Sequence, residues 1–196
     1  MLQVLLASFA LLCAGQTQAF DLDQLSAQLA KAELVRGPFI QQKHLRALAQ
    51  PLTSKGQFVL SRELGLLWFL HSPLQQDYRI DANGIARRGP QGWQPPGQDV
   101  AAQQSRLFLA VLKGDHSGLA RDFDLHLQGT SKAWQLQLQP RSLLLKQIFS
   151  DIQIQGGALV ERIELREVQG DSTLLLMPAT QPGSELTEQE RRDFAP

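Results

Sequence analysis

Residues 56–73 read GQFVLSRELGLLWFLHSP, and this stretch carries the pattern that decides the fold. Phe58 and Leu60 alternate with Gln57, Val59 and Ser61, and a polar turn then leads into the apolar run 66–70. Alternation of this kind is typical of a β-strand with one dry face and one wet face. The stretch therefore predicts two strands joined by a turn, with an apolar face that the rest of the chain must cover.

The same two-residue period recurs along the chain. It is clearest in residues 39–45, 77–81, 123–128, 134–139, 152–155, 163–166 and 173–177. Asn83-Gly84 is a strong hairpin turn signal after one of these segments. We expect about eight to eleven strands in one large antiparallel sheet. Such a sheet hides its apolar face by closing into a barrel, by stacking on a second sheet, or by curling around helices.

Helical spacing appears between the strand segments. In residues 21–34, Leu22, Leu25, Leu29 and Ala32 share one face, and Gly37-Pro38 breaks the pattern. Further helices are predicted over residues 99–113 and 142–149, and the pair Thr187 and Glu190 predicts a short terminal helix. The first two helices are candidates for covering the sheet. A curled sheet under helices encloses an apolar cavity, which is a recurrent site for apolar ligands.

The two ends of the chain differ from the middle. Residues 2–14 are apolar but short for a membrane span, and the small residues Thr17 and Ala19 follow. This predicts a secretory signal over residues 1–19, with a buried N-terminal helix as the alternative, since no Lys or Arg precedes the run. A domain over residues 20–177 and a polar tail over 178–196 complete the expected organisation. Cys13, the only cysteine, falls within the predicted signal, so no disulfide is expected.

Composition and motifs favour a binding protein over an enzyme. The 19 basic and 19 acidic residues balance, and no basic stripe indicates nucleic acid. The four histidines lack metal-ligand spacing. Asp115-His116-Ser117 contains the letters of a triad, but triad geometry comes from the fold, so we expect only a turn there. We predict no catalytic residue, no metal and no cofactor.

Arg62 is the most informative polar residue of the opening stretch. If Phe58 and Leu60 face inward, Arg62 also faces inward by the two-residue period. It can then bond backbone carbonyls of a covering helix, meet a polar headgroup, or extend to solvent at the strand end, and composition favours the last. Trp68 also has two possible roles. It is either a core residue or part of the wall of a ligand cavity.

Several short motifs together resemble the LolA family, the periplasmic carriers of outer-membrane lipoproteins. Phe39-Ile40-Gln41 is similar to the family's F-x-Q, and Gly56-x-Phe58-x-Leu60-x-Arg62 is similar to its strand-end motif. Trp68, Pro73 and then Asp81-x-Asn83-Gly84 follow in the family's order. Residues 163–165 and 170–173 resemble its closing strands, so that the likeness spans most of residues 21–177.

The resemblance implies an α+β fold, in which a strongly curved antiparallel sheet forms an incomplete, open β-barrel covered by a few helices. It implies a monomeric, exported periplasmic protein that shields acyl chains, takes acylated cargo from an inner-membrane donor protein and passes it to an outer-membrane acceptor protein. The alternative is a lipid- or peptide-sensing module of the same fold. Arg62 would hold the cover by hydrogen bonds. The implied ligand-binding residues are Phe39, Phe58, Leu60, Arg62, Trp68, Leu70 and Ile80.

The chain departs from the family pattern in four places, which include an unusually Pro-rich loop over residues 93–97 and a closing region shortened to a polar tail. Glu63 stands where the family has Pro, which changes the turn and offers Arg62 a local ion-pair partner. Residues 85–89, IARRG, replace the family's aromatic segment. These changes extend the expected cargo to other lipids or lipid-linked molecules.

Overall fold

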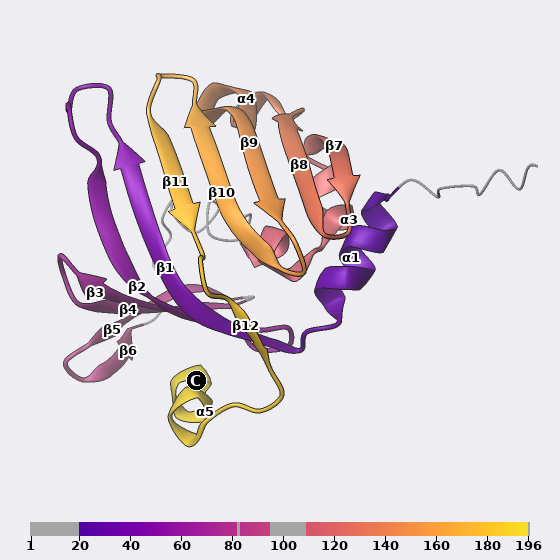
Figure 1. The fold of residues 1–196 in the computed structure, drawn as a ribbon. Coiled ribbons are helices and arrows are strands. Elements are labelled where there is room, and N and C mark those ends of the chain that lie inside the picture. Colours follow the sequence, from indigo (N-terminus) through magenta and orange to yellow (C-terminus); the bar gives the residue numbers. More distant parts are fainter. Residues whose placement is uncertain (1–19, 82, 95–108, 196) are drawn as a thin grey trace, which may run out of the picture.

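A single curved sheet dominates the computed structural model, which describes residues 20–81, 83–94 and 109–195 (Figure 1). The described strands lie in the order β6-β5-β4-β3-β2-β1-β11-β10-β9-β8-β7, with β12 beside β1, and these neighbours pair antiparallel. The edges β6 and β7 are not joined, so the sheet is an open half-barrel. The predicted fold class is confirmed.

The strands are β1 (Leu34–His44), β2 (Leu52–Ser61), β3 (Gly65–Ser72), β4 (Gln76–Asp81), β5 (Gly84–Gly89), β6 (Gly92–Gln94), β7 (Phe123–Thr130), β8 (Ala133–Pro140), β9 (Phe149–Gly156), β10 (Val160–Glu167), β11 (Ser172–Leu176) and β12 (Gln181–Gly183). The helices are α1 (Leu22–Ala30), α3 (His116–Ala120), α4 (Leu143–Ile148) and α5 (Glu188–Phe194), and residues 109–113 are also helical. The rest of the helix predicted over 99–113 lies outside the described residues.

Helix α1 begins where predicted and ends earlier. Asp21 caps it, and a capping box joins Asp21 and Gln24. The prediction of helix through residue 34 is wrong, because Leu34 and Val35 already belong to β1 and are buried on opposite faces of the sheet. An extended backbone buries both side chains, which a further helical turn would not do.

Gly37-Pro38 does not break the chain's regular structure but lies inside β1. On one side, β1 pairs with β12 through residues 34–36 and with β11 through residues 40–44. Pro38 falls between these two partners, where its missing N–H costs no ladder hydrogen bond on that side. The strand prediction for residues 39–45 was therefore too short at its beginning.

The main core lies between the inner face of the sheet and the helices. Leu25 and Leu29 of α1, together with Val111 and Leu112, pack in one cluster with the inward side chains of the strands. The alternation predicted for β8 is confirmed, since Trp134, Leu136 and Leu138 are buried there. Figure 1 shows α1 and α3 beside β7 and β8. The helices thus cover the open side of the half-barrel.

A second, smaller cluster lies on the outer face of the sheet. It joins Leu34, Val59, Leu67 and Phe194. Val59 and Leu67 are apolar because this outer face of residues 56–73 is covered as well. The predicted terminal helix is present as α5, with the capping box between Thr187 and Glu190. Residues of the polar tail therefore add a strand and a docked helix to the sheet.

Arginine side chains fasten α5 to the sheet. Arg88 pairs with the buried Asp193 at 2.5 Å, and its guanidinium lies over the ring of Trp93. Arg79 donates to the backbone carbonyl of Ala195. In the part of the chain that the structure describes, no helix is long and apolar enough to cross a membrane.

Candidate functional site

Three aromatic side chains form the centre of the inner face of β1–β3. The rings of Phe39 and Trp68 stack at 3.7 Å with an interplanar angle of 20°, and Phe58 lies 6.2 Å from Trp68. All three are buried. The register places Phe58 directly opposite Trp68, so the aromatic group follows from the pairing of β2 with β3.

Gly56 makes room for this aromatic group. It lies opposite Phe39 in the β1–β2 pair. A Cβ at position 56 would come within 2.7 Å of the Phe39 ring and within 1.9 Å of the Phe69 carbonyl oxygen. Only glycine lets the Phe39 ring cross the neighbouring strand to reach Trp68.

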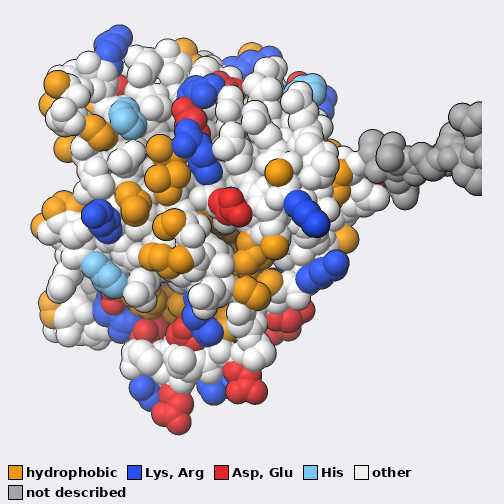
Figure 2. Space-filling view, viewed as in Figure 1, with side chains coloured by type: hydrophobic (Ala, Val, Ile, Leu, Met, Phe, Trp, Pro, Cys, Tyr) orange, Lys and Arg blue, Asp and Glu red, His pale blue; other side chains and the backbone are white. Residues whose placement is uncertain are grey.

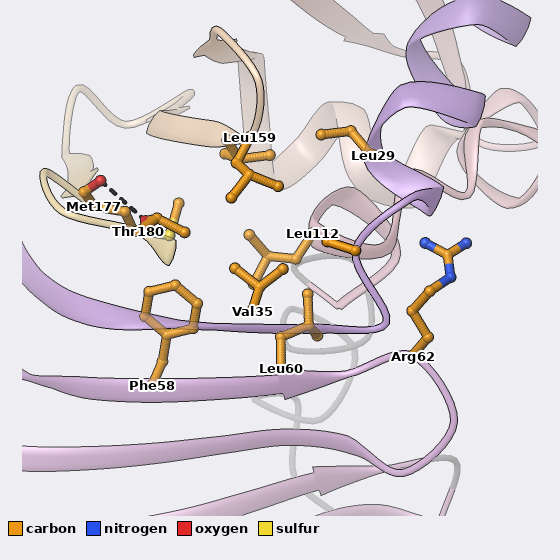
Figure 3. Close-up of a pocket in the computed structure, with 11 residues that line it drawn as sticks. Leu29, Val35, Phe58, Leu60, Arg62, Leu112, Leu159, Met177 and Thr180 are labelled. Atoms are coloured by element: carbon orange, nitrogen blue, oxygen red, sulfur yellow. Dashed lines mark hydrogen bonds between the residues drawn. The ribbon is translucent and has the colours of Figure 1, made fainter. Parts of the chain in front are cut away.

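A small apolar cavity of about 20 Å³ lies between the sheet and its cover (Figure 3). Three of the predicted site residues line it, namely Phe58, Leu60 and Arg62. The others, Phe39, Trp68, Leu70 and Ile80, belong to the same apolar cluster but lie outside the cavity wall. A space of this size holds about one water molecule. This cavity between the described residues therefore has no room for an acyl chain.

The remaining cavity wall comes from elements that are distant in the sequence. It consists of Leu29, Ala32, Val35, Leu112, Leu159, Val160, Met177 and Thr180. Leu29 and Leu112 were predicted as apolar helix positions, whereas the four residues from 159 onwards were not recognised as site residues. Their apolar character alone is no signal, because it is shared by every core position. Only the strand order brings them to β2.

Arg62 fastens the cover to the sheet. Its Nη1 donates a hydrogen bond of 3.0 Å to the carbonyl oxygen of Lys113, at the end of the helical residues 109–113. Among the described residues no ion pair joins Arg62 to Glu63, so the local pairing that Glu63 offered is wrong. Of the open interpretations, the bond to a covering helix is the one found. A helix end presents unpaired carbonyls, and these attract a cation more strongly than solvent does.

The nearby Arg62 affects the pKa of Lys113. Burial, and then the positive charge of Arg62, lower the pKa of Lys113 from its usual value, while Asp115 opposes the shift. The side chains of Arg62 and Lys113 thus lie close enough for their positive charges to repel. The carbonyl of Lys113, and not its side chain, is what holds the arginine.

A second polar group fastens α1 to the segment after residue 113. The hydroxyl of Ser26 lies 2.6 Å from both the Gly114 carbonyl oxygen and His116 Nδ1. His116 Nε2 lies 3.2 Å from the Asp23 carboxylate. Farther along α1, Gln28 Nε2 donates to the Gly157 carbonyl at 2.7 Å. Apolar contacts of Leu25, Leu29, Val111 and Leu112 with the inner face of the sheet add to these bonds.

An open groove of about 960 Å³ lies outside the cavity, beside the β9–β10 and β11–β12 connections. It shares Ala32, Leu159, Met177 and Thr180 with the cavity wall, so these side chains separate the two spaces. Lys31, Lys132 and Glu161 supply its charges. Figure 2 shows hydrophobic side chains around a hollow on this face of the molecule. The groove therefore leads to the closed interior.

The triad-like sequence Asp115-His116-Ser117 has a structural role. Asp115 caps α3 by accepting the Gly118 N–H and the Ser117 hydroxyl, and these hydrogen bonds lower the pKa of Asp115. The turn predicted for residues 115–117 is thus a helix start. Within residues 20–81, 83–94 and 109–195, no three His, Cys, Asp or Glu side chains gather where they could hold a metal ion.

The family follows from the sequence and agrees with this architecture. A family described as outer membrane lipoprotein carrier protein LolA-like matches residues 14–192. The chain belongs to this LolA-like family. The resemblance stated from the motifs is confirmed. No curated protein matches the sequence.

Solved structures show where the LolA-like fold recurs. The first is a chain in the MucA/MucB complex of Pseudomonas aeruginosa, with 17% identity and a TM-score of 0.51, covering 86% of this chain and 58% of that one. A LolA superfamily protein from Nitrosomonas europaea has 10% identity, a TM-score of 0.49 and coverage of 86% and 94%. The lipoprotein LppX of Mycobacterium tuberculosis has 12% identity, a TM-score of 0.47 and coverage of 85% and 96%. This chain spans little more than half of the first relative, and at these identities the likeness concerns the fold alone.

Proposed function

We propose that this protein is a periplasmic carrier that takes the acyl chains of a lipoprotein or another lipid into its apolar interior and moves them toward the outer membrane. Membership of the LolA-like family supports this role. The observation that carries it is an apolar interior beneath a cover that hydrogen bonds of Arg62, Ser26 and Gln28 help to hold. No covalent chemistry is needed. Export by residues 1–19 and a carrier domain over residues 20–177 belong to the same proposal.

The small size of the cavity limits how an acyl chain can bind. A cavity of about 20 Å³ does not admit an acyl chain, so cargo must displace the cover or the wall residues Leu159 and Met177. Burial of ten methylene groups returns about 8 kcal/mol at about 0.8 kcal/mol each. Loss of a charged hydrogen bond such as that of Arg62 costs about 1.5–3 kcal/mol. Burial of the acyl chain therefore outweighs the polar bond of Arg62, and the chain would replace apolar contacts that the cover gives up.

The open groove is the path by which an acyl chain would reach the interior. Among the described residues, Ala32, Leu159, Met177 and Thr180 line both the groove and the cavity. Phe58, Leu60 and Arg62 would meet the chain first on the opposite wall, and Phe39, Trp68, Leu70 and Ile80 would line the space that opens behind them. An inner-membrane donor protein and an outer-membrane acceptor protein would load and unload this site.

Native mass spectrometry of the protein, purified without detergent, tests the proposal together with uptake of a fluorescent fatty-acyl probe. We expect an acylated adduct or saturable probe binding. Leu159→Glu should lower probe binding at least tenfold, because it places a charge on the half-buried wall, whereas Leu159→Met should preserve it. Leu64→Glu, at an exposed position away from the cavity, is the matched control. An apo mass with no probe uptake overturns the carrier role.

The alternative is a sensing module of the same fold. It is favoured by the likeness to a chain that was solved in the MucA/MucB complex, in which two proteins associate. Crosslinking in cells, followed by identification of the captured proteins, distinguishes the two functions. Capture of a membrane-bound regulator without any transfer of acylated cargo would favour the sensor. Transfer of acylated cargo between membrane fractions would favour the carrier.

A further inference from the structure

Exposed hydrophobic side chains gather at one end of the half-barrel. Among the described residues seven large hydrophobic side chains are exposed, and Leu143 and Leu74 are the most open at 81% and 76%. Six of the seven lie at the end of the sheet where β1 stops and β2 begins. These are Leu48, Leu52, Leu74, Leu143, Leu144 and Val168, which we call the apolar rim. Leu64 alone lies at the opposite end, in the β2–β3 turn.

Strand register places the segments of the apolar rim at the same end. His44 pairs with Ser172, Arg166 pairs with Ser172 from the other side, and Glu167 pairs with Phe149. Two hydrogen bonds join the segments directly. Arg46 N donates to Asp171 Oδ1 at 2.8 Å, and Val168 N donates to the Ile148 carbonyl at 3.0 Å. The β1–β2 loop, the β10–β11 loop and α4 are therefore neighbours, and the β3–β4 loop with Leu74 follows beyond β2.

The same end of the molecule is positively charged although the whole chain is neutral. Its segments, residues 43–55, 71–76, 140–148 and 167–172, carry the basic side chains of Lys43, Arg46, Lys55, Arg141 and Lys146 against the acidic side chains of Glu167 and Asp171. Arg141 pairs with Asp124 of β7 at 3.4 Å, so the basic excess of this end is carried by Lys43, Arg46, Lys55 and Lys146. Figure 2 shows hydrophobic and basic side chains together over the β1–β2 loop.

We propose that the apolar rim docks on the surface of an anionic lipid bilayer. Leucines on loop tips between lysines and arginines combine apolar insertion with attraction to anionic headgroups. The rim side chains come from four separate segments and project from loops and from the first turn of α4. None of them lines the cavity or the groove described above. A fluid, flat and negatively charged surface fits such projecting side chains better than a folded partner does.

This inference does not depend on the proposed function. Docking through the apolar rim needs no acyl chain in the interior, and the rim shares no residue with the cavity or the groove. Failure of acyl-probe uptake would leave vesicle binding untouched. Failure of vesicle binding would likewise leave uptake untouched.

Vesicle flotation tests the docking surface. The probe is a set of vesicles of phosphatidylglycerol and phosphatidylethanolamine, compared with vesicles of phosphatidylcholine alone. We expect the wild-type protein to bind the anionic vesicles, with binding that weakens as salt is raised. The triple variant Leu48→Gln, Leu143→Gln and Leu144→Gln should bind at least tenfold more weakly. The double variant Arg46→Ala and Lys146→Ala should lose about fivefold for each charge removed.

Leu64→Gln is the matched control, because it removes the exposed leucine at the other end. It should bind as the wild type does. All variants carry the same N-terminus, verified by intact mass, so that any binding by residues 1–19 is equal among them. Circular dichroism melting checks that each variant is folded. Absence of wild-type binding, equal binding of the triple variant, or an equal loss in Leu64→Gln overturns the proposal and assigns the rim to a protein contact instead.

Discussion

Arg62 Nη1 donates a hydrogen bond of 3.0 Å to the carbonyl oxygen of Lys113, across 51 positions of the sequence. The bond joins the end of β2 to the end of a covering helix, above the apolar interior. In the opened state that the proposed function requires, this carbonyl would move away with the cover and the bond would be lost. A contact of this kind sets how readily the cover opens.

Arg62→Met tests this role while keeping a side chain of similar length. Loss of a charged hydrogen bond worth about 1.5–3 kcal/mol should favour the open state. If the protein binds acyl chains, the apparent affinity for a fatty-acyl probe should rise about tenfold or more. Independently of any ligand, amide hydrogen exchange in residues 109–113 should become faster. Arg141→Met, which removes an exposed ion pair with Asp124, should change neither measurement. Unchanged exchange in residues 109–113 would show that the Arg62 hydrogen bond does not hold the cover closed.

Ser26→Ala removes the bonds that hold α1 to the segment after residue 113. The Ser26 hydroxyl contacts both the Gly114 carbonyl and His116 Nδ1 at 2.6 Å in a partly buried place. Two groups would be left without this partner, so the free energy of unfolding should fall by about 1–3 kcal/mol. Urea denaturation measures it. Ser150→Ala removes one exposed hydroxyl bond and should stay within about 0.5 kcal/mol of the wild type. If both variants lose the same free energy of unfolding, the Ser26 contacts stabilise the fold no more than an exposed hydroxyl bond does.

The inner face of the sheet could be predicted from the sequence, but the cavity could not. The two-residue period alone places Phe58 and Leu60 inward and predicts that Arg62 follows them. It contains no information on which strands are neighbours. Met177 and Thr180 reach the cavity because β11 pairs with β1, and Lys113 reaches Arg62 because the sheet curves around its cover. Pairing across such distances depends on tertiary packing, which short-range patterns do not encode.

The same limit explains the errors at the ends of the domain. Helical spacing in residues 21–34 continued to Leu34, and no local signal opposed it. Burial on the outer face of the sheet, where Leu34 packs with Phe194 of α5, favours the strand over a further helical turn. That face could not be foreseen, because α5 was recognised only as a capped helix without a place on the sheet. Val59 and Leu67 in the opening stretch were the available signal, since a strand that is apolar on both faces is covered on both.

Asp115→Asn should make the stability of the protein less dependent on pH in the acid range. Hydrogen bonds from the Gly118 N–H and the Ser117 hydroxyl lower the pKa of Asp115 in the folded state. A lowered pKa adds stability above the unfolded pKa of about 3.9, and this stability is lost as the pH falls through the folded value. The wild type should therefore exceed the variant at pH 7, by less than about 1 kcal/mol because solvent screens the exposed carboxylate. The difference should shrink as the pH falls below about 3.9 in urea titrations. A difference that does not shrink there would show that charge is not its origin.

Gly56→Ala should disrupt the aromatic group at the centre of the inner face. The added methyl would lie 1.9 Å from the Phe69 carbonyl oxygen and 2.7 Å from the Phe39 ring, and the strand backbone cannot yield as a side chain can. Either β2 and β3 separate or Phe39 leaves Trp68, and overpacking of this kind costs about 3 kcal/mol. Thermal unfolding and the near-ultraviolet circular dichroism of the stacked rings report the two effects. Gly89→Ala is the matched control, because its methyl meets only the Gln94 side chain, which can rotate away. If both variants melt like the wild type, the close crossing of Phe39 over Gly56 does not hold the aromatic group in place.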